Sequence, residues 1–287
     1  MAEVEKIAVI GFGTMGAGIT QVFAEAGFNV IARDVADEIL KRGLDIIENG
    51  PFGLKKAVAK SRITEKQAKE IFSRIKVTLN LSEAVKDADF IVEAVFENLD
   101  LKKKIFSEID SLCPEHTIIV SNTSTLSITS LAAATKRPEK VAGMHFFNPP
   151  QIMKLVEVIR GLRTSNETVE KVREIAIKLG KTPVVCKDIP GFISNRVWIL
   201  SILEGIRLYE QGIASAKDID NVMKLGFNWP MGPLELSDLV GLDVLLDVAE
   251  SLYKDTGNHA HMPPLILRQM VVSGFLGRKT KKGFYEY

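Results

Sequence analysis

The sequence predicts an α/β protein with a doubly wound, mostly parallel sheet, a helical-hairpin insertion, and a second domain that is entirely α-helical. Short β-branched runs alternate with amphipathic helical segments through the first two thirds of the chain, which is the pattern of a parallel sheet covered by helices. After KDIPGF (187–192) the remaining segments have only helical periodicity. Pro190–Gly191 end the strand series, so we predict a first domain at 1–188 and a helical domain at 189–287, with the boundary near 188–190.

The predicted strands are short and rich in Val and Ile, and several are apolar on both faces, as expected for strands buried between two layers of helices. They lie at 6–11, 29–33, 75–79, 90–95, 117–121, 140–146, 154–160 and 182–187. Helices are predicted between them at 15–26, 100–111, 127–134 and 166–179. In the second domain, helices are predicted at 192–212, 215–226, 231–254 and 262–274.

The connection between the second and third predicted strands is long and has helical periodicity on both sides of NGPFG (49–53). We predict a helical hairpin at about 36–74 that projects from the sheet. Residues 41–76 contain 10 Lys/Arg and 4 Asp/Glu, a local net charge of +6 in a chain of formal charge +1. Two interpretations stay open: a solvated helix face, or a docking surface for a phosphorylated ligand.

The bulk composition excludes several classes of protein. Hydrophobic residues make up 46% and charged residues 25%, a globular rather than disordered mixture, and the near-zero net charge gives no bias toward nucleic acid. Cys113 and Cys186 lack metal or CxxC spacing, so we expect no metal and a reducing compartment. No apolar run reaches the roughly 18 residues of a membrane helix, and the acidic N-terminus is unlike a signal peptide. We therefore expect a soluble, cytoplasmic protein without a membrane partner.

A glycine-rich turn directly follows the first predicted strand and opens a helix, with the spacing Gly11-x-Gly13-x-x-Gly16. The first glycine permits the tight turn, the second lets backbone N–H groups approach a pyrophosphate, and the third lets helix and strand pack closely. The helix N-terminus then favours phosphate. A glycine turn without a ligand is the alternative interpretation. The pattern predicts a Rossmann-type site whose candidate cofactor-binding residues in this loop are Gly11, Gly13, Thr14, Met15 and Gly16.

The second predicted strand leads into Asp34, 18 residues after Gly16. A carboxylate at this position accepts hydrogen bonds from the ribose hydroxyls and repels a 2′-phosphate. Asp34 therefore favours NAD as the cofactor, while the neighbouring Arg33 leaves NADP open.

The segment GMHFFNPPQIMKLVEVI (143–159) sets two titratable residues in apolar surroundings. His145 is expected at the C-terminal end of its strand, the edge at which open α/β sheets bind ligands. An imidazole can accept a proton near neutrality, and Glu157 could balance the resulting charge and fix the ring tautomer. The turn through NPPQIM would bring the second strand back beside the first. The alternatives are a core histidine bonded to backbone and a glutamate paired with Lys or Arg.

Two further polar residues are candidates for holding a substrate oxygen. Ser124 in SNTST (121–125) follows a strand, where a hydroxyl often serves only to cap the next helix. Asn195 lies near the start of the first C-terminal helix, on a face shared with Phe192, Ile199 and Ile202. An amide on an apolar helix face needs hydrogen-bond partners, so both a structural and a functional role stay open.

These motifs together resemble the L-3-hydroxyacyl-CoA dehydrogenase family, particularly its short-chain 3-hydroxybutyryl-CoA members. The resemblance runs in order through IGFGTMGAGI, VEAVFENLDLKK, SNTSTLSIT, HFFNPPQIMKLVEVI, KDIPGFISNR and GPLELSDLVGLD to the terminal GRKTKKGFYEY, and it covers essentially the whole chain. It implies reversible, NAD-dependent oxidation of (S)-3-hydroxyacyl-CoA to 3-ketoacyl-CoA. It also implies a homodimer formed through the C-terminal helical domain.

The resemblance also implies roles for individual residues. It makes His145 and Glu157 the catalytic pair, and it has Ser124 and Asn195 hydrogen-bond the substrate oxygen.

Three further residues acquire expected roles in the same way. Glu97 and Lys102 match positions at the nicotinamide end of the cofactor; without the resemblance they are an acid at a helix N-terminus and a helix lysine. Lys60 matches a lysine that meets the CoA phosphates. The chain departs from the mitochondrial pattern at Gly53, where that pattern has a CoA-binding serine.

Two rival functions remain to be tested. One is a related hydroxy-acid dehydrogenase that acts on a substrate without CoA, which the basic hairpin disfavours. The other is a non-catalytic, crystallin-like nucleotide-binding protein, which the complete Ser-His-Glu-Asn set disfavours. His259 and His261 have no further ligands at metal spacing, and no role is predicted for them.

Overall fold

The computed structural model describes residues 4–287 of the chain. The chain divides into two compact units, Met1–Ile189 and Pro190–Tyr287, which we call the N-terminal and C-terminal units. The division falls in the range 188–190 where the strand-like pattern ends in the sequence. Among residues 4–287, no helix is both long and apolar enough to cross a lipid bilayer.

The N-terminal unit is built on an eight-stranded sheet with the order β3-β2-β1-β4-β5-β6-β7-β8. Its strands are β1 (Lys6–Ile10), β2 (Asn29–Arg33), β3 (Ile75–Thr78), β4 (Phe90–Glu93), β5 (Ile118–Ser121), β6 (Val141–Phe146), β7 (Leu155–Arg160) and β8 (Thr182–Lys187). All neighbouring strands are parallel except β6 and β7. The predicted doubly wound, mostly parallel sheet is therefore confirmed.

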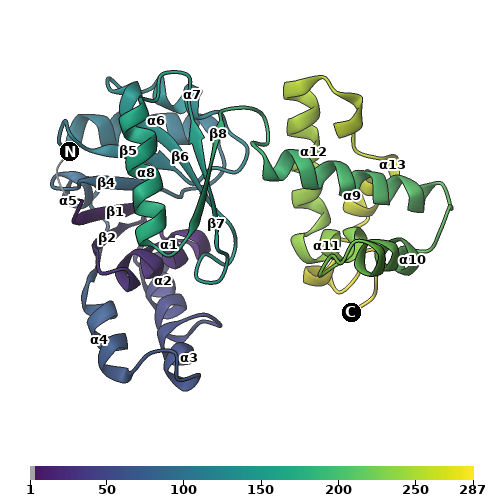
Figure 1. Cartoon of the computed structure of the whole chain (residues 1–287), viewed down its shortest axis with the longest axis horizontal. Helices are drawn as coiled ribbons and strands as arrows, with labels where there is room; N and C mark the ends of the chain where they lie inside the picture. Colours follow the sequence, from purple (N-terminus) through teal and green to yellow (C-terminus); the bar gives the residue numbers. More distant parts are fainter. Residues whose placement is uncertain (1–3) are drawn as a thin grey trace. The chain divides into compact units, whose positions relative to one another are not determined.

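Helices cover both faces of this sheet because its central strands are apolar on both sides: every residue of β4, β5 and β6 is buried. The covering helices are α1 (Thr14–Glu25), α5 (Leu81–Val85), α6 (Leu99–Leu112), α7 (Ile128–Ala132) and α8 (Asn166–Lys178). Figure 1 shows α8 lying across the sheet, where it contacts β6, β7 and β8. The sequence did not predict α5, because five residues are too few to carry a helical period. A short 3₁₀ turn, Pro138–Lys140, precedes β6.

The insertion between β2 and β3 projects from the sheet (Figure 1) and contains three helices rather than a two-helix hairpin. They are α2 (Asp37–Asn49), α3 (Leu54–Ala59) and α4 (Glu65–Ser73). The second arm is broken because Ser61 adopts a left-handed conformation (φ 54°). Thr64 then starts a new helix through a capping box with Gln67.

The C-terminal unit is helical, as predicted. Its helices are α9 (Ser194–Glu210), α10 (Ala216–Asn221), which continues into a π-helical turn (Val222–Gly226), α11 (Pro233–Val240), α12 (Leu242–Thr256) and α13 (Leu265–Val272), with 3₁₀ turns at His259–His261 and Arg278–Thr280. The predicted single helix at 231–254 is wrong: Gly241, with φ 105°, ends α11 and starts α12. The first helix begins at Ser194 rather than at 192, since Phe192 has φ 47°.

Candidate active site

The glycine turn after β1 has the local geometry of a dinucleotide loop. Gly11 has φ 98°, and a Cβ there would lie 2.6 Å from the backbone of Ala94 at the end of β4. A Cβ on Gly16 would lie 1.8 Å from the Gly11 carbonyl oxygen, so neither position tolerates a side chain. By contrast, the space around Gly13 is open to 4 Å. Gly13 is also the N-cap of α1 and makes no side-chain capping bond. Its helix N-terminus is therefore available to a phosphate.

Asp34, just beyond β2, lies against this glycine loop. Its Oδ2 accepts a hydrogen bond from the Phe12 N–H at 2.6 Å, and its Oδ1 accepts one from the Val35 N–H at 2.7 Å. The neighbouring Arg33 donates from Nε to the Leu79 carbonyl at 3.2 Å. The carboxylate is thus fixed beside the loop, while the guanidinium is engaged with the segment after β3. This arrangement fits a ribose carrying free hydroxyls.

His145 and Glu157 are brought together by the one antiparallel pairing in the described sheet. They are direct partners in the β6–β7 register, and Nδ1 of His145 lies 2.8 Å from Oε2 of Glu157. Both residues are buried, with 6% and 1% of their surface exposed. Because a carboxylate can only accept, Nδ1 is the donor in this contact, and in the neutral ring the lone pair then lies on Nε2.

Ser124 lies in the loop between β5 and α7, and Glu97 organises that loop. Glu97 Oε1 accepts from Ser124 N at 2.9 Å, Thr125 N at 3.1 Å and Thr123 Oγ1 at 2.5 Å. Loss of solvent would raise the pKa of Glu97, but the nearby Lys102 cation and these hydrogen bonds lower it below its ordinary value. The N-cap of α7 is Ser127, so Ser124 does not have the capping role that its position in the sequence suggested.

The Ser124 loop is also tied to the strand that carries His145. The side-chain oxygen of Asn122 accepts a hydrogen bond from the Phe146 N–H at 2.9 Å. In the parallel β5–β6 pair, Ser121 is in register with Gly143. The loop and the histidine therefore start from adjacent strand ends.

Lys102 is almost completely buried and lies between two carboxylates. Its Nζ is 2.7 Å from Oε1 of Glu93 and 3.4 Å from Oε2 of Glu97. Glu93, with 0% exposure, was not predicted as a site residue. A signal for it exists in the sequence, because FIVE ends an apolar strand in a lone acid just as LVEVI encloses Glu157.

Asn195 belongs to the C-terminal unit and is 7% exposed on α9. Its Oδ1 accepts a hydrogen bond from Nε1 of Trp198 at 2.7 Å. Ile199 and Ile202 on the same helix are fully buried, so the amide does lie on an apolar face as the sequence indicates.

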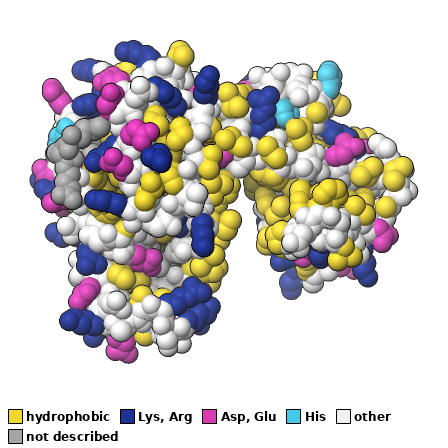
Figure 2. Space-filling view, viewed as in Figure 1, with side chains coloured by type: hydrophobic (Ala, Val, Ile, Leu, Met, Phe, Trp, Pro, Cys, Tyr) yellow, Lys and Arg dark blue, Asp and Glu magenta, His cyan; other side chains and the backbone are white. Residues whose placement is uncertain are grey.

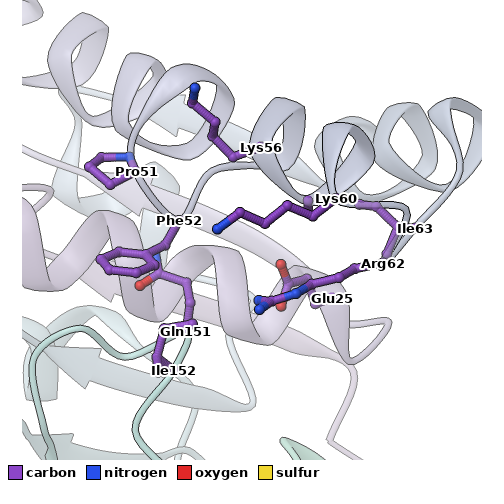
Figure 3. Close-up of a pocket in the computed structure, with 10 residues that line it drawn as sticks. Glu25, Pro51, Phe52, Lys56, Lys60, Arg62, Ile63, Gln151 and Ile152 are labelled. Carbon is purple, nitrogen blue, oxygen red and sulfur yellow. The ribbon is translucent and has the colours of Figure 1, made fainter.

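Lys60 lines a pocket between the insertion and the β6–β7 turn (Figure 3). The pocket has a volume of about 190 Å³, and its polar and aromatic walls include Glu25, Phe52, Lys56, Lys60, Arg62 and Gln151. Figure 3 shows Lys60 and Arg62 reaching over the same space as Phe52 and Gln151. Desolvation in this region raises the pKa of Glu25. Three of the ten cations of residues 41–76, Lys56, Lys60 and Arg62, thus line this concave surface.

The pocket wall is held by a chain of amide contacts. Gln151 Nε2 donates to Gln21 Oε1 at 3.0 Å, and Gln21 Nε2 donates to the Phe52 carbonyl at 3.0 Å. The β6–β7 turn, α1 and the insertion are therefore connected.

Across residues 4–287, no group of three or more His, Cys, Asp or Glu side chains could hold a metal ion.

Comparison with known proteins agrees with these features. Family models of the 3-hydroxyacyl-CoA dehydrogenase NAD binding domain and C-terminal domain match residues 6–189 and 191–287. The chain is 46% identical over 285 residues to the probable 3-hydroxybutyryl-CoA dehydrogenase of Bacillus subtilis, covering 99% of this chain and 98% of that protein. It is 43% identical over 287 residues to the mitochondrial hydroxyacyl-coenzyme A dehydrogenase of Homo sapiens, covering 99% and 91%.

A solved structure gives the same result. The (S)-3-hydroxybutyryl-CoA dehydrogenase of Ralstonia eutropha matches with a TM-score of 0.95 and 41% identity, over 99% of each chain. The resemblance inferred from the motifs is confirmed: the chain belongs to the 3-hydroxyacyl-CoA dehydrogenase family.

Proposed function

We propose that this protein is an NAD-dependent dehydrogenase that reversibly oxidises (S)-3-hydroxyacyl-CoA to 3-ketoacyl-CoA, with 3-hydroxybutyryl-CoA as a short-chain substrate. The observation that carries the proposal is the buried contact between His145 and Glu157 at 2.8 Å, in a chain that belongs to this family. The relatives named for 3-hydroxybutyryl-CoA cover nearly all of the chain, which supports the short acyl group.

Oxidation of the alcohol requires a base that accepts the hydroxyl proton while hydride leaves the carbon that bears the hydroxyl. NAD, when bound, would supply the hydride acceptor. We assign Nε2 of His145 as the base in oxidation and the acid in reduction. The imidazolium formed in a buried site needs a counter-charge, and Glu157 supplies it while holding the Nδ1–H tautomer. We assign Ser124 and Asn195 as donors to the substrate oxygen, on the basis of the family resemblance.

Several residues would hold the cofactor. The open helix N-terminus at Gly13, between Gly11 and Gly16 and beside Thr14 and Met15, suits the pyrophosphate. Asp34 suits the adenosine ribose. Glu97 and Lys102 lie beside the Ser124 loop, and we assign them to the nicotinamide end.

The CoA part of the substrate is assigned to the basic insertion. Lys60 lines its pocket together with Lys56 and Arg62, which offers phosphate groups several cations. Gly53 stands where the mitochondrial pattern has a serine. It is the N-cap of α3 and makes no side-chain hydrogen bond. The cations rather than a hydroxyl would therefore provide the contacts.

We also propose that the C-terminal unit forms a homodimer. Val222, Leu225 and Phe227 are 60%, 84% and 67% exposed. Figure 2 shows hydrophobic side chains gathered on this unit in the region of α10 and α11, a surface suited to a second copy of the chain. Light scattering of the purified protein would test this, and a monomer at micromolar concentration would contradict it.

A cytoplasmic location is proposed from the free thiols of Cys113 and Cys186.

The decisive experiment follows NADH absorbance with acetoacetyl-CoA. Wild-type protein should oxidise NADH, and His145→Ala should lose roughly 10²–10⁴ in rate. His116→Ala is the matched control, because His116 is solvent-exposed and pairs with Asp89. Near-normal turnover by His145→Ala would contradict the assignment. Equal efficiency with free acetoacetate would favour a non-CoA hydroxy-acid dehydrogenase, and no turnover of any substrate would favour a crystallin-like role.

A further inference from the structure

We infer that Glu93 is a positioning residue for the reaction: it fixes Lys102, and thereby leaves Glu97 to hold the loop that carries Ser124. The inference rests on the proposed function. It adds a residue that touches neither substrate nor cofactor and that acts only through its neighbours.

The first observation is that the Glu93 carboxylate is buried and fully engaged. Its Oε1 accepts from Lys102 Nζ at 2.7 Å and from Val95 N at 2.7 Å, and its Oε2 accepts from Ser121 Oγ at 2.6 Å. Glu93 and Lys102 have side-chain exposures of 0% and 1%. A buried charge without a partner is unfavourable, so each of these two groups holds the other in place.

The second observation is that Lys102 lies at unequal distances from two carboxylates. Glu93 takes the shorter contact at 2.7 Å, and Glu97 is 3.4 Å away. Glu97 Oε1 is therefore available to the N–H groups of Ser124 and Thr125. If Glu93 lost its charge, Glu97 would be the remaining carboxylate within 4.0 Å of Lys102 in the described part of the chain. With 37% of its side chain exposed, Glu97 has room to turn toward the lysine and leave the loop.

The third observation is the place of Glu93 in the sheet. It is in register with Ile10 at the end of β1 and with Ser121 at the end of β5. The next residue, Ala94, lies against Gly11 of the dinucleotide loop. Glu93 thus lies where the cofactor loop and the Ser124 loop both leave the sheet. Loss of its charge would therefore affect the positions of both loops, which flank the proposed reaction centre.

A buried ion pair can also be purely structural, and the experiment must separate the two roles. Glu93→Gln preserves shape and acceptor oxygen but removes the charge. We expect kcat with acetoacetyl-CoA and NADH to fall about 10- to 100-fold, the effect of a small misplacement of reacting groups. The kinetic isotope effect on kcat, measured with NADH that carries deuterium at the transferred hydride, should rise because hydride transfer becomes slower than product release.

The matched control is Asp110→Asn. Asp110 is also buried and forms an ion pair with Arg137 at 2.6 Å, but none of its hydrogen bonds or ion pairs within residues 4–287 reaches the Ser124 loop. This variant should lose thermal stability like Glu93→Gln while keeping kcat within about twofold and an unchanged isotope effect.

The specific readout is a double-mutant cycle with Glu97→Gln. If Glu93 acts through Lys102 and Glu97, Glu93→Gln should change kcat much less in the Glu97→Gln background than in wild type. Equal fold-changes in both backgrounds would overturn the inference. A Glu93→Gln protein with normal kcat and a stability loss like that of Asp110→Asn would overturn it too.

If Glu93→Gln does not fold, Glu93→Asp keeps the charge on a shorter side chain and should still raise the isotope effect; normal kinetics, or failure of both variants to fold, rejects the inference. Inactive wild-type protein would reject the proposed function and this inference together. Active wild-type protein with an unaffected Glu93→Gln rejects the inference alone.

Discussion

His145 and Glu157, 12 residues apart in the chain, are direct cross-strand partners, with Nδ1 of the histidine 2.8 Å from Oε2 of the glutamate. The contact depends on the strand reversal between β6 and β7, which puts both side chains on the same face. A parallel connection of the kind found elsewhere in this sheet needs a crossover and would not bring residues so close in sequence together.

Glu157→Gln should therefore be nearly as damaging as loss of the histidine. Glutamine can still accept from Nδ1, but it provides no charge for the imidazolium, so kcat should fall roughly 10²–10⁴. Steady-state reduction of acetoacetyl-CoA measures this. Glu170→Gln, which changes an exposed acid paired with Arg173, should leave kcat unchanged, and a similar kcat for Glu157→Gln and wild type would argue against the pair.

Asp34→Ser should shift the cofactor preference toward NADPH. The carboxylate is fixed beside the glycine loop by Phe12 N and Val35 N, and charge-assisted hydrogen bonds contribute about 1.5–3 kcal/mol. The kcat/KM for NADH should fall about 10- to 100-fold, with a smaller change for NADPH. Asp37→Asn, an exposed acid in the first turn of α2, is the control. An unchanged ratio of NADH to NADPH efficiency would refute the role of Asp34.

Lys60→Ala should raise KM for acetoacetyl-CoA without changing kcat, because its partner would be a phosphate distant from the reacting carbon. We expect an increase of about 2- to 10-fold that shrinks at high salt, as for a partly exposed ion pair. Lys66→Ala, on α4 with 87% side-chain exposure, should have no effect. If KM for free acetoacetate rises by the same factor, Lys60 does not recognise CoA.

Stability of the C-terminal unit should decrease in acid through His261. Thr256 Oγ1 donates to the Leu252 carbonyl and so accepts from His261 Nδ1 at 2.9 Å. Nε2 is buried without a hydrogen-bond partner among the described residues. Burial and the Arg196 cation lower the pKa of His261. The unfolded state therefore binds the proton more readily than the folded state. The contribution of His261 to the free energy of unfolding is complete above about pH 6.5 and is lost as the pH falls below that value.

Urea unfolding between about pH 5 and pH 8 tests this, followed by the fluorescence of Trp198 and Trp229, which both lie in the C-terminal unit. His261→Asn keeps a donor at the Nδ1 position and should reduce the pH dependence, at some cost in stability at neutral pH. His259→Asn, at an exposed position, should keep the wild-type slope. An identical slope in all three proteins would show that His261 does not contribute.

Much of the fold follows from local chemistry that can be recognised in the sequence. Each observed strand begins or ends within two residues of its predicted bounds, because a buried β-branched run has a period and a length that helices do not share. The helix boundaries were less predictable. The break at Gly241 and the turn at Ser61 depend on left-handed backbone conformations, and in a helical pattern such residues are easily taken as interior positions.

Part of the candidate site was also predictable. His145 and Glu157 stand out because each is a lone titratable residue in an apolar strand, and Asp34 because it follows a strand at a fixed distance from the glycine turn. Glu93 has the same kind of signal but was missed, since its partner Lys102 is on the following helix, where a lysine normally faces solvent. Only the packing of α6 on the sheet shows that this lysine is buried.

The parallel sheet, the dinucleotide loop and the family can all be recognised in the sequence, because they depend on periodicity, glycine spacing and the order of motifs along the chain. Only the packed structure shows that Nδ1 of His145 faces Glu157, that Glu93 rather than Glu97 makes the shorter contact with Lys102, and that Lys56, Lys60 and Arg62 line one pocket. The physical reason is that hydrogen bonds and ion pairs act over about 3–4 Å. Distances of that size are set by how strands and helices pack, which the spacing of residues along the chain does not specify.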